Sequence, residues 1–507
     1  MKSLLAPRAR VSVDISERPE PGRLSSAWCF AALIAAAAVY YLVLLSNGTF
    51  RVFAPEMLDQ AYNSMLTHML HGQFDVDPKA IGFEAITRNG KTFAYFGVFP
   101  ALLRLPALVF ADISQAELAR LSCLCALVVF IGLQLGALFS VHNCLPSASR
   151  RPGFLTVMAG ATLLSGPQIY ILGSAAIYHE SILWAAAMAA GFNLIVVRAA
   201  FADCPLRGVD LVLLAIVAGL AINTRPPIGL DLSLSAIVLI ITSGWRQYAA
   251  RRDDEGAVAR NTLGPPLVVA ISILGLLTAG AGAVNFARWG NPLTFLDFHY
   301  YGEVQQTASR AAVLRDYGDF NVGRVWIGTL YYATGLPWLL KGVPPFAEFL
   351  RDRIVAIEAP PLTPLLTNPI TVLLATVGVY RAFWKSDLPT RSLITLRVVL
   401  AGHVVPMIVV LGFFYFTLRY RFDFAPFMTL ASLIGYRSVS LSLGAARDRQ
   451  AGRWLAGGIV LMAVGIVFSH YALLMHKAWS MAVPVEVRRA VLPFLPFAYW
   501  PLASPAP

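Results

Sequence analysis

Charged residues are scarce in this sequence. Only 13% of the 507 residues are Asp, Glu, Lys or Arg, whereas a soluble domain has roughly 25%. Hydrophobic residues make up 57% of the chain, and the mean hydropathy is +0.64. Apolar runs of about 20 residues alternate with short basic loops, which excludes an ordinary soluble protein and predicts a polytopic helical membrane protein.

Three further features are absent. The five cysteines neither repeat at the spacing of zinc ligands nor form a visible disulfide framework. No cleavable signal is evident, because the first apolar run begins near Ala27 after an arginine-rich segment. No inverted or parallel internal repeat is visible, which counts against the common transporter architectures.

The positive charge is concentrated in short loops. A net charge of +12 first suggests nucleic acid as a partner. However, the Lys and Arg residues lie between apolar runs, as expected for loops on the cytoplasmic side of a membrane. We therefore expect no nucleic-acid partner, a cytoplasmic N-terminus and an extracytoplasmic C-terminus.

The apolar runs predict about eleven transmembrane helices. Their approximate ranges are 27–46, 117–141, 154–173, 182–197, 209–222, 228–245, 263–286, 369–383, 393–416, 424–443 and 455–475. The expected organisation is a cytoplasmic tail at 1–26, a transmembrane domain at 27–475 and an outer tail at 476–507. Two long extracytoplasmic loops lie within the domain, at 51–116 and 287–366.

Each long loop contains a semi-hydrophobic segment that we predict to lie in the membrane interface. Residues 98–111 are too short and too rich in proline to cross comfortably. Residues 325–343 are interrupted by Gly335, Pro337 and Lys341, and a crossing is the open alternative for them.

The first outer loop begins with a predicted amphipathic helix. Pro55 stands near its start and Gly72 past its end. Asp59 falls in the expected first turn, where backbone N–H groups favour a carboxylate. An acid on such a helix, near the bilayer surface, can reach a lipid-anchored substrate. Asp75 and Glu84 follow in the same loop, with ordinary loop acids as the alternative.

Three other polar groups are expected on the outer face. Tyr178, His179 and Glu180 stand at the mouth of the fourth helix, with a simple helix cap as the alternative for Glu180. Arg225 lies in a tight hairpin, where it binds phosphate or reaches lipid headgroups. Arg419 and Arg421 follow the ninth helix. Their guanidinium groups suit a phosphate dianion, with pairing to Asp423 or to phospholipid as the alternatives.

Acids and cations on one membrane face suit transfer of a group from a membrane-held phosphate. Arginines stabilise the leaving phosphate, and a carboxylate deprotonates the acceptor hydroxyl. An oxocarbenium-like transition state of sugar transfer is also favoured by carboxylates. From the residues alone, the prediction stops at group transfer or binding at the outer face.

Several short motifs resemble those of the GT-C superfamily of membrane glycosyltransferases, both in their order along the chain and in their expected position on the outer face. That superfamily includes protein mannosyltransferases, aminoarabinose transferases of lipid A and many bacterial homologues. The motifs are Leu58-Asp59-Gln60-Ala61-Tyr62, Asn89-Gly90-Lys91, Tyr95-Phe96-Gly97 with Pro100, Tyr178-His179-Glu180, Thr224-Arg225-Pro226, the run from Asn285 to Pro292, and Arg419-Tyr420.

The resemblance implies a GT-C-type bundle in a bacterial cytoplasmic membrane, with an active site facing outward. It implies a polyprenyl-phosphate sugar as donor, a lipid, glycan or protein as acceptor, and Asp59 as catalytic base. The expected donor-phosphate ligands are Arg225, Arg419, Arg421 and Arg104, and the expected sugar- or acceptor-binding residues are Tyr178, His179, Glu180, Asp75, Glu84 and Tyr95.

The chain departs from the pattern of the superfamily because it has no second acidic residue next to Asp59. Some relatives have an acid adjacent to the loop aspartate, whereas here Glu56 precedes Asp59 by three residues and Gln60 follows it. No metal-ligand cluster stands out in the sequence. A divalent metal held by Asp59 and Glu180 is the one cofactor left open.

Two other functions stay open. A transporter or lipid flippase predicts ionisable residues near mid-membrane, of which His403 is the best candidate. A non-catalytic component of a polysaccharide assembly complex predicts that Asp59 is dispensable. Neither the sugar nor the acceptor is named by the sequence.

Overall fold

The chain folds almost entirely into helices. The computed structural model describes residues 22–253, 264–302, 307–358, 362–386, 388–480 and 483–494. Within these ranges the only sheets are two short two-stranded ones. The prediction of an all-α polytopic membrane protein is confirmed.

A helix stands at each of the eleven expected ranges. The helices are α1 (Gly22–Leu45), α5 (Ala119–Asn143), α6 (Pro152–Leu164) with α7 (Pro167–Ile171), α8 (Ile177–Phe201), α9 (Gly208–Ile222), α10 (Pro226–Asp253), α11 (Gly264–Trp289), α18 (Pro369–Phe383), α19 (Thr390–Gly402) with α20 (Val404–Leu411), α21 (Ala425–Ala445) and α22 (Asp448–Trp479). In the described ranges, eight spans are long and apolar enough to cross a membrane. The number of crossings therefore stays a prediction.

Two of the predicted spans are broken. The third breaks between α6 and α7, where Gly166 has a φ of 101° and Pro167 follows. The ninth breaks between α19 and α20 at His403. A Cβ added to Gly402 would lie 2.1 Å from Ser235 Oγ and 2.8 Å from Asp231 Oδ1, so this break is pressed against α10.

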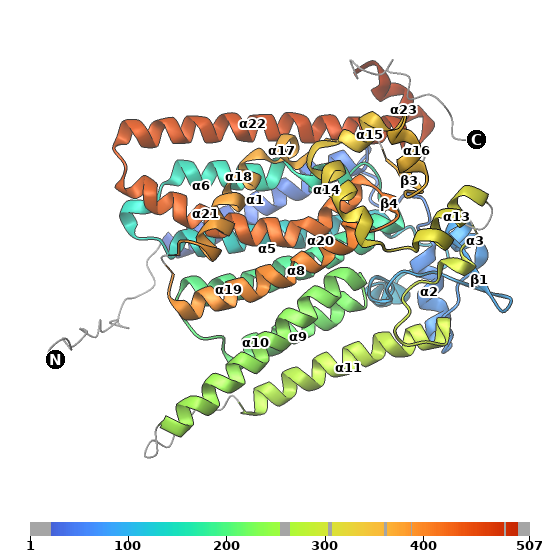
Figure 1. Cartoon of the computed structure of the whole chain (residues 1–507), viewed down its shortest axis with the longest axis horizontal. Helices are drawn as coiled ribbons and strands as arrows, with labels where there is room; N and C mark the ends of the chain where they lie inside the picture. The colour runs from blue at the N-terminus through green and yellow to red at the C-terminus, as the bar shows by residue number, and fades with distance from the viewer. Residues whose placement is uncertain are drawn as a thin grey trace.

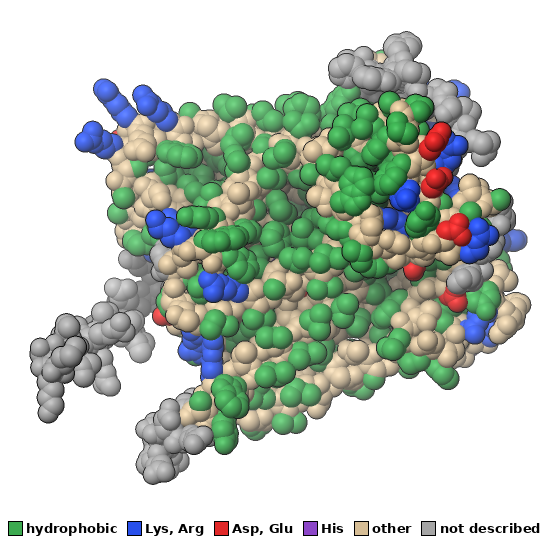
Figure 2. Space-filling model, in the orientation of Figure 1, with side chains coloured by type: hydrophobic (Ala, Val, Ile, Leu, Met, Phe, Trp, Pro, Cys, Tyr) green, Lys and Arg blue, Asp and Glu red, His purple; other side chains and the backbone are tan. Residues whose placement is uncertain are grey.

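The helices run roughly parallel in one layered bundle (Figure 1). Helix α22 lies along one edge, and α9, α10 and α11 lie along the opposite edge. In Figure 2 a broad apolar belt covers the visible face. The end of the bundle from which α11 starts carries Lys and Arg with almost no Asp or Glu, whereas the other end carries both Lys or Arg and most of the visible Asp and Glu. This distribution is typical of a protein with its basic loops on the cytoplasmic side.

The first outer loop differs from the prediction at its start. Residues 57–60 form a turn, and α2 (Ala61–Leu70) begins only after Asp59. The expected helix from Pro55 was therefore wrong over its first turn. Leu58 takes a left-handed φ of 62°, which an interior helical residue does not adopt.

The rest of this loop is compact. It consists of α3 (Pro78–Ile81), η1 (Gly82–Glu84), the hairpin β1 (Ile86–Arg88) and β2 (Lys91–Phe93), α4 (Phe99–Leu102) and η2 (Leu105–Val109). Asn89 and Gly90 both have positive φ, as the tight two-residue hairpin turn requires. A buried apolar cluster that includes Tyr62, Leu66, Phe96 and Ile177 packs the loop onto the start of α8.

The second outer loop is a series of short elements. They are η4 (Phe298–Tyr300), α13 (Ala308–Tyr317), η5 (Val322–Arg324), α14 (Val325–Thr334), α15 (Leu336–Leu340), α16 (Phe346–Arg351), β3 (Ala356–Ile357) and α17 (Pro364–Thr367). The segment 325–343 is broken at Gly335, which has a φ of 72°, so it forms no single helix that could cross a bilayer.

The segment after α20 returns to this loop. Strand β4 (Tyr415–Phe416) pairs in parallel with β3, and η6 (Leu418–Phe424) carries the two expected arginines back into the bundle. At the end of the described chain, α23 (Val485–Val491) and η7 (Leu492–Phe494) lie near the same outer elements (Figure 1).

Candidate active site at the outer end

Asp59 is held in a closed turn rather than on a helix. Its Oδ2 accepts a hydrogen bond from the backbone N–H of Glu56 at 2.9 Å, and the residue is only 8% exposed. Leu58, directly before it, has the uncommon left-handed φ noted above. Strained backbone next to an acidic side chain is a frequent feature of functional sites.

Arg104 holds the Asp59 turn in place through hydrogen bonds from its side chain. Its guanidinium donates to the Asp59 carbonyl oxygen at 3.0 Å, to Asn63 Oδ1 at 2.5 Å and to Glu180 Oε2 at 2.7 Å. Arg104 and Glu180 are both buried. Because a buried pair is costly to break, these contacts tie the turn rigidly to the start of α8.

Glu56 is also engaged. Arg120 Nε donates to Glu56 Oε1 at 2.5 Å, and the backbone N–H of Ala175 donates to Oε2 at 3.1 Å. Burial raises the pKa of Glu56 above its ordinary value, although the bonds from Arg120 oppose this shift. Within the described ranges, no group of three His, Cys, Asp or Glu side chains is arranged to hold a metal ion.

The Asp59 loop docks directly on the hairpin that carries Arg225. The backbone N–H of Phe99 donates to the Asn223 carbonyl at 2.9 Å. A Cβ at Gly97 would lie 2.2 Å from the same oxygen, so only glycine permits this approach. Asp59 and Arg225 are therefore both at the same end of the bundle, the end predicted to face outward, and they are joined through residues 97–104.

Arg225 is paired with Asp423 on η6. Its Nε and Nη2 donate to the two carboxylate oxygens at 2.7 and 2.6 Å, a bidentate geometry. Its guanidinium also lies 5.3 Å from the centre of the Tyr420 ring. The pairing with Asp423, one of the alternatives from the sequence, thus applies to Arg225 rather than to Arg419 or Arg421.

Arg419 joins the two outer loops and α8. Its guanidinium lies 4.5 Å from the centre of the Tyr178 ring, and Nη1 is 3.4 Å from Glu358 Oε1. The Tyr178 hydroxyl donates to Glu84, and the Tyr301 hydroxyl donates to Glu84 at 2.8 Å. The sequence pattern gave no signal for Glu358 or Tyr301, because each lies in an irregular loop outside any motif.

Tyr95 lies beside this group. It stacks on Phe96 with ring centres 4.2 Å apart. Burial raises its pKa well above the ordinary value, and the Glu84 carboxylate adds to the shift. Its hydroxyl therefore stays protonated at any physiological pH and can act as a hydrogen-bond donor.

Two predicted site residues lie elsewhere. His179 is buried, with Nδ1 2.7 Å from the Ser174 carbonyl and its ring 5.8 Å from the ring of His476. Asp75 lies beyond the end of α2, 3.4 Å from His68 and 3.7 Å from Lys91. Of the three consecutive residues 178–180, only Tyr178 contacts the group around Arg419.

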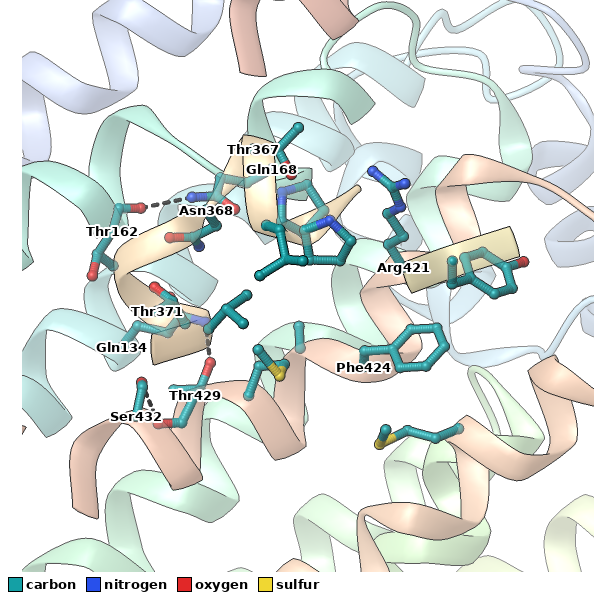
Figure 3. A pocket seen from close by; sticks show the side chains of 18 of the residues that line it. Gln134, Thr162, Gln168, Thr367, Asn368, Thr371, Arg421, Phe424, Thr429 and Ser432 are labelled. Atoms are coloured by element: carbon teal, nitrogen blue, oxygen red, sulfur yellow. Dashed lines mark hydrogen bonds between the residues drawn. The ribbon is translucent and has the colours of Figure 1, made fainter. Parts of the chain in front are cut away.

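Arg421 faces a different space from Arg419. It lines a cavity of about 420 Å³ within the bundle, bounded by α5, α6, α14, α17, α18, α20 and α21. The walls are mostly apolar. In Figure 3 Arg421 lies on one side of the cavity, and the amide and hydroxyl side chains of Gln134, Thr371, Thr429 and Ser432 lie on the other.

The Arg421 guanidinium is buried without a carboxylate partner in the described chain. Its Nε and Nη2 have no hydrogen-bond acceptor among those residues. Burial lowers the pKa of Arg421 to about 10, so the group is still charged at neutral pH. An anion in this cavity would therefore meet an unneutralised cation.

A second buried charged group lies deeper in the bundle. His403 Nδ1 is 2.6 Å from Asp231 Oδ2, and His403 Nε2 is 2.8 Å from Asn193 Oδ1. All three residues are completely enclosed or nearly so. The sequence singled out His403 but not Asp231, which lies in the apolar first part of α10.

No family model matches the sequence, and no curated protein matches it. Among solved structures, the oligosaccharyltransferase of Archaeoglobus fulgidus tethered to an acceptor peptide matches at 14% identity with a TM-score of 0.49. The match covers 90% of this chain and 56% of that one. ArnT from Cupriavidus metallidurans bound to undecaprenyl phosphate matches at 16% identity with a TM-score of 0.44, covering 93% of this chain and 71% of that one.

The present chain spans 56% of the length of the archaeal enzyme. At these identities and TM-scores, we transfer neither an activity nor any site residue from them.

Proposed function

We propose that this chain is a GT-C-type membrane glycosyltransferase. It moves a sugar from a polyprenyl-phosphate donor to an acceptor on the extracytoplasmic side of a bacterial cytoplasmic membrane. The acceptor is a lipid, a glycan or a protein.

The observation that carries this proposal is Arg421. A lone buried guanidinium beside an apolar cavity suits a ligand with an anionic head and a long hydrocarbon tail. A polyprenyl phosphate has both parts. Burying a cation without a carboxylate costs stability, and a bound phosphate offsets that cost.

Asp59 is proposed as the general base. It removes the proton from the acceptor hydroxyl, whose oxygen attacks the anomeric carbon of the donor sugar. The bond between that carbon and the phosphate oxygen breaks, and the lipid phosphate leaves with the bonding electron pair. Because guanidinium groups stabilise the leaving phosphate, that step needs no general acid.

The other predicted residues take different roles in this proposal. Arg225 and Arg419 line the path of the phosphate with charges that Asp423 and Glu358 partly neutralise. Tyr178, Glu84 and Tyr95 would contact the sugar, together with Tyr301. Arg104 and Glu180 are committed to one another, so we assign them to positioning Asp59 rather than to binding phosphate or metal.

A transporter is the second candidate, because Asp231 and His403 form an ionisable pair within the bundle. The contacts favour a structural role for this pair. Both residues are 0% exposed, and neither lines any of the cavities described for this chain. A proton or substrate path would require access that these contacts do not provide.

The test is sugar transfer by purified full-length protein. Radiolabelled polyprenyl-phosphate sugars serve as donors, and extracted envelope lipids and glycans serve as acceptors. We expect Asp59→Asn to lower the rate by about 10² to 10⁴, the usual contribution of a positioned base. Asp112→Asn is the matched control, because Asp112 is an exposed acid in the same loop whose side chain accepts hydrogen bonds from Ser114. Equal rates for wild type and Asp59→Asn would overturn the assignment.

A further inference from the structure

A second sizeable cavity lies at the outer end, behind the Asp59 turn. Its volume is about 360 Å³, and it is open toward the outside. It is bounded by the turn before Asp59, the start of α5 and the start of α23. The lining residues are Pro55, Glu56, Met57, Arg120, Val483, Pro484, Val485 and Arg488. None of these residues was singled out by the sequence as a ligand.

The cavity carries an excess of positive charge. Arg120 contributes one guanidinium, which Glu56 neutralises. Arg488 contributes a second, and its buried Nε has no hydrogen-bond acceptor among the described residues. Two guanidinium groups thus face one carboxylate, which favours an anionic ligand.

The cavity adjoins the turn that holds the proposed base. Glu56 lines it and donates its backbone N–H to Asp59 Oδ2 at 2.9 Å. A molecule seated between Met57 and Arg488 therefore lies beside the turn that holds Asp59.

Residues 170–175 link this cavity to the space around Arg421. Ala175 donates its backbone N–H to Glu56, which lines the present cavity. Tyr170 shares a small cavity with Arg421. The two candidate sites are therefore joined by a short stretch of chain.

We propose that this cavity binds a phosphate or carboxylate group of the acceptor, and that the acceptor is therefore an anionic molecule. The identification of the ligand as the acceptor rests on the proposed function, whereas the anion site itself does not. Arg488 is the principal ligand, and Arg120 holds Glu56 away from the anion.

The first experiment measures binding of inorganic pyrophosphate to the full chain. The protein is reconstituted in phosphatidylcholine nanodiscs with polyprenyl phosphate present to occupy the other cavity. We expect Arg488→Ala to weaken pyrophosphate binding about tenfold, because a charge-assisted hydrogen bond is lost. Arg488→Lys should retain most of the affinity. Arg489→Ala is the matched control, since Arg489 is exposed on the same helix and does not line the cavity.

Equal binding by wild type and Arg488→Ala would overturn the site, as would an equal loss in Arg489→Ala. A second arm adds phosphatidylglycerol to the nanodiscs. If this lipid weakens pyrophosphate binding in wild type but not in Arg488→Ala, the site holds a bilayer headgroup and the acceptor assignment fails. Unchanged binding supports a soluble or acceptor-borne anion.

A third arm measures transfer. In Arg488→Ala the KM for the acceptor should rise about tenfold, while kcat and the KM for the donor stay at the wild-type values. A loss of kcat alone would overturn the acceptor role. If Asp59→Asn transfers as well as wild type while pyrophosphate binding still depends on Arg488, the proposed function fails and the anion site stands.

Discussion

Two buried charged groups within the bundle have opposite surroundings. At Asp231 and His403, each imidazole nitrogen faces an oxygen, and Asn193 donates its own amide to the Pro426 carbonyl at 3.0 Å. At Arg421, two guanidinium nitrogens have no acceptor in the described chain, and a cavity lies alongside. The polar atoms of the first group are met by other parts of the chain, whereas the second has unmet donors, which a bound phosphate would satisfy in the proposed function.

The contacts of His403 use both of its ring nitrogens. Nε2 lies 2.8 Å from Asn193 Oδ1, and Nδ1 lies 2.6 Å from Asp231 Oδ2. Such a pair joins α8, α10, α20 and α21 without leaving any polar atom for a substrate. Position within the membrane is therefore a weaker sign of function than an unmet hydrogen bond.

The largest expected effect is on folding. His403→Ala leaves the Asp231 carboxylate buried and unpaired, which should cost about 3 to 5 kcal/mol of stability. The measurement is the unfolding temperature of the detergent-solubilised protein. The control is His403→Leu combined with Asp231→Leu, which removes both charges and should restore most of the stability. Loss of transfer by His403→Ala without loss of stability would contradict the structural role of this pair.

Replacement of Arg421 should raise the stability of the protein and lower its rate of sugar transfer. Arg421→Met removes a buried charge, so the ligand-free protein should unfold at a higher temperature. The same change should lower transfer about 10²-fold, because the donor phosphate loses its unneutralised cation. Unfolding temperature and donor KM are measured on the same preparations, with Arg421→Lys as an intermediate. A variant that is both less stable and fully active would show that Arg421 is structural.

The pH dependence should separate the two groups further. Burial lowers the pKa of Arg421 to about 10, so the folded state carries the full penalty of the buried charge below about pH 10. That penalty disappears as the pH rises above about 10 toward the higher pKa of the unfolded chain. We therefore expect affinity for polyprenyl phosphate to fall above about pH 10, by roughly tenfold per unit. Binding to Arg421→Met, measured between pH 8 and 11, should show no such fall, and an identical fall in both proteins would exclude Arg421 as its source.

The sequence predicted the parts of this molecule that depend on local pattern. Apolar length located a helix at every expected span, and the basic loops indicated which ends share a side. The tight hairpin at Arg225 was also predicted, because Pro226 begins the following helix. These features depend on whether a segment lies in lipid or in water, and the composition of that segment alone is enough to predict this.

The sequence did not predict the features that depend on contacts between distant segments. The Asp59 turn is fixed by Arg104 from 45 residues away, and the Arg421 cavity draws its walls from helices that span most of the chain. Arg419 and Arg421 are two residues apart, yet one contacts Tyr178 and the other lines the apolar cavity. No spacing rule distinguishes them, because η6 is irregular and its neighbours come from elsewhere.

The smallest effect is expected where an ion pair is open to water. Arg151 and Asp448 lie 3.9 Å apart at the basic end of the bundle, and the Asp448 side chain is 98% exposed. Water solvates both charges whether or not they meet, so the pair adds little. Asp448→Ala should leave both the unfolding temperature and the rate of transfer at wild-type values. Asp448→Ala could instead destabilise the protein as strongly as His403→Ala. Burial would then not decide whether a charged side chain contributes to stability. The contrast between Arg421 and Asp231, which depends on burial, would lose its physical basis.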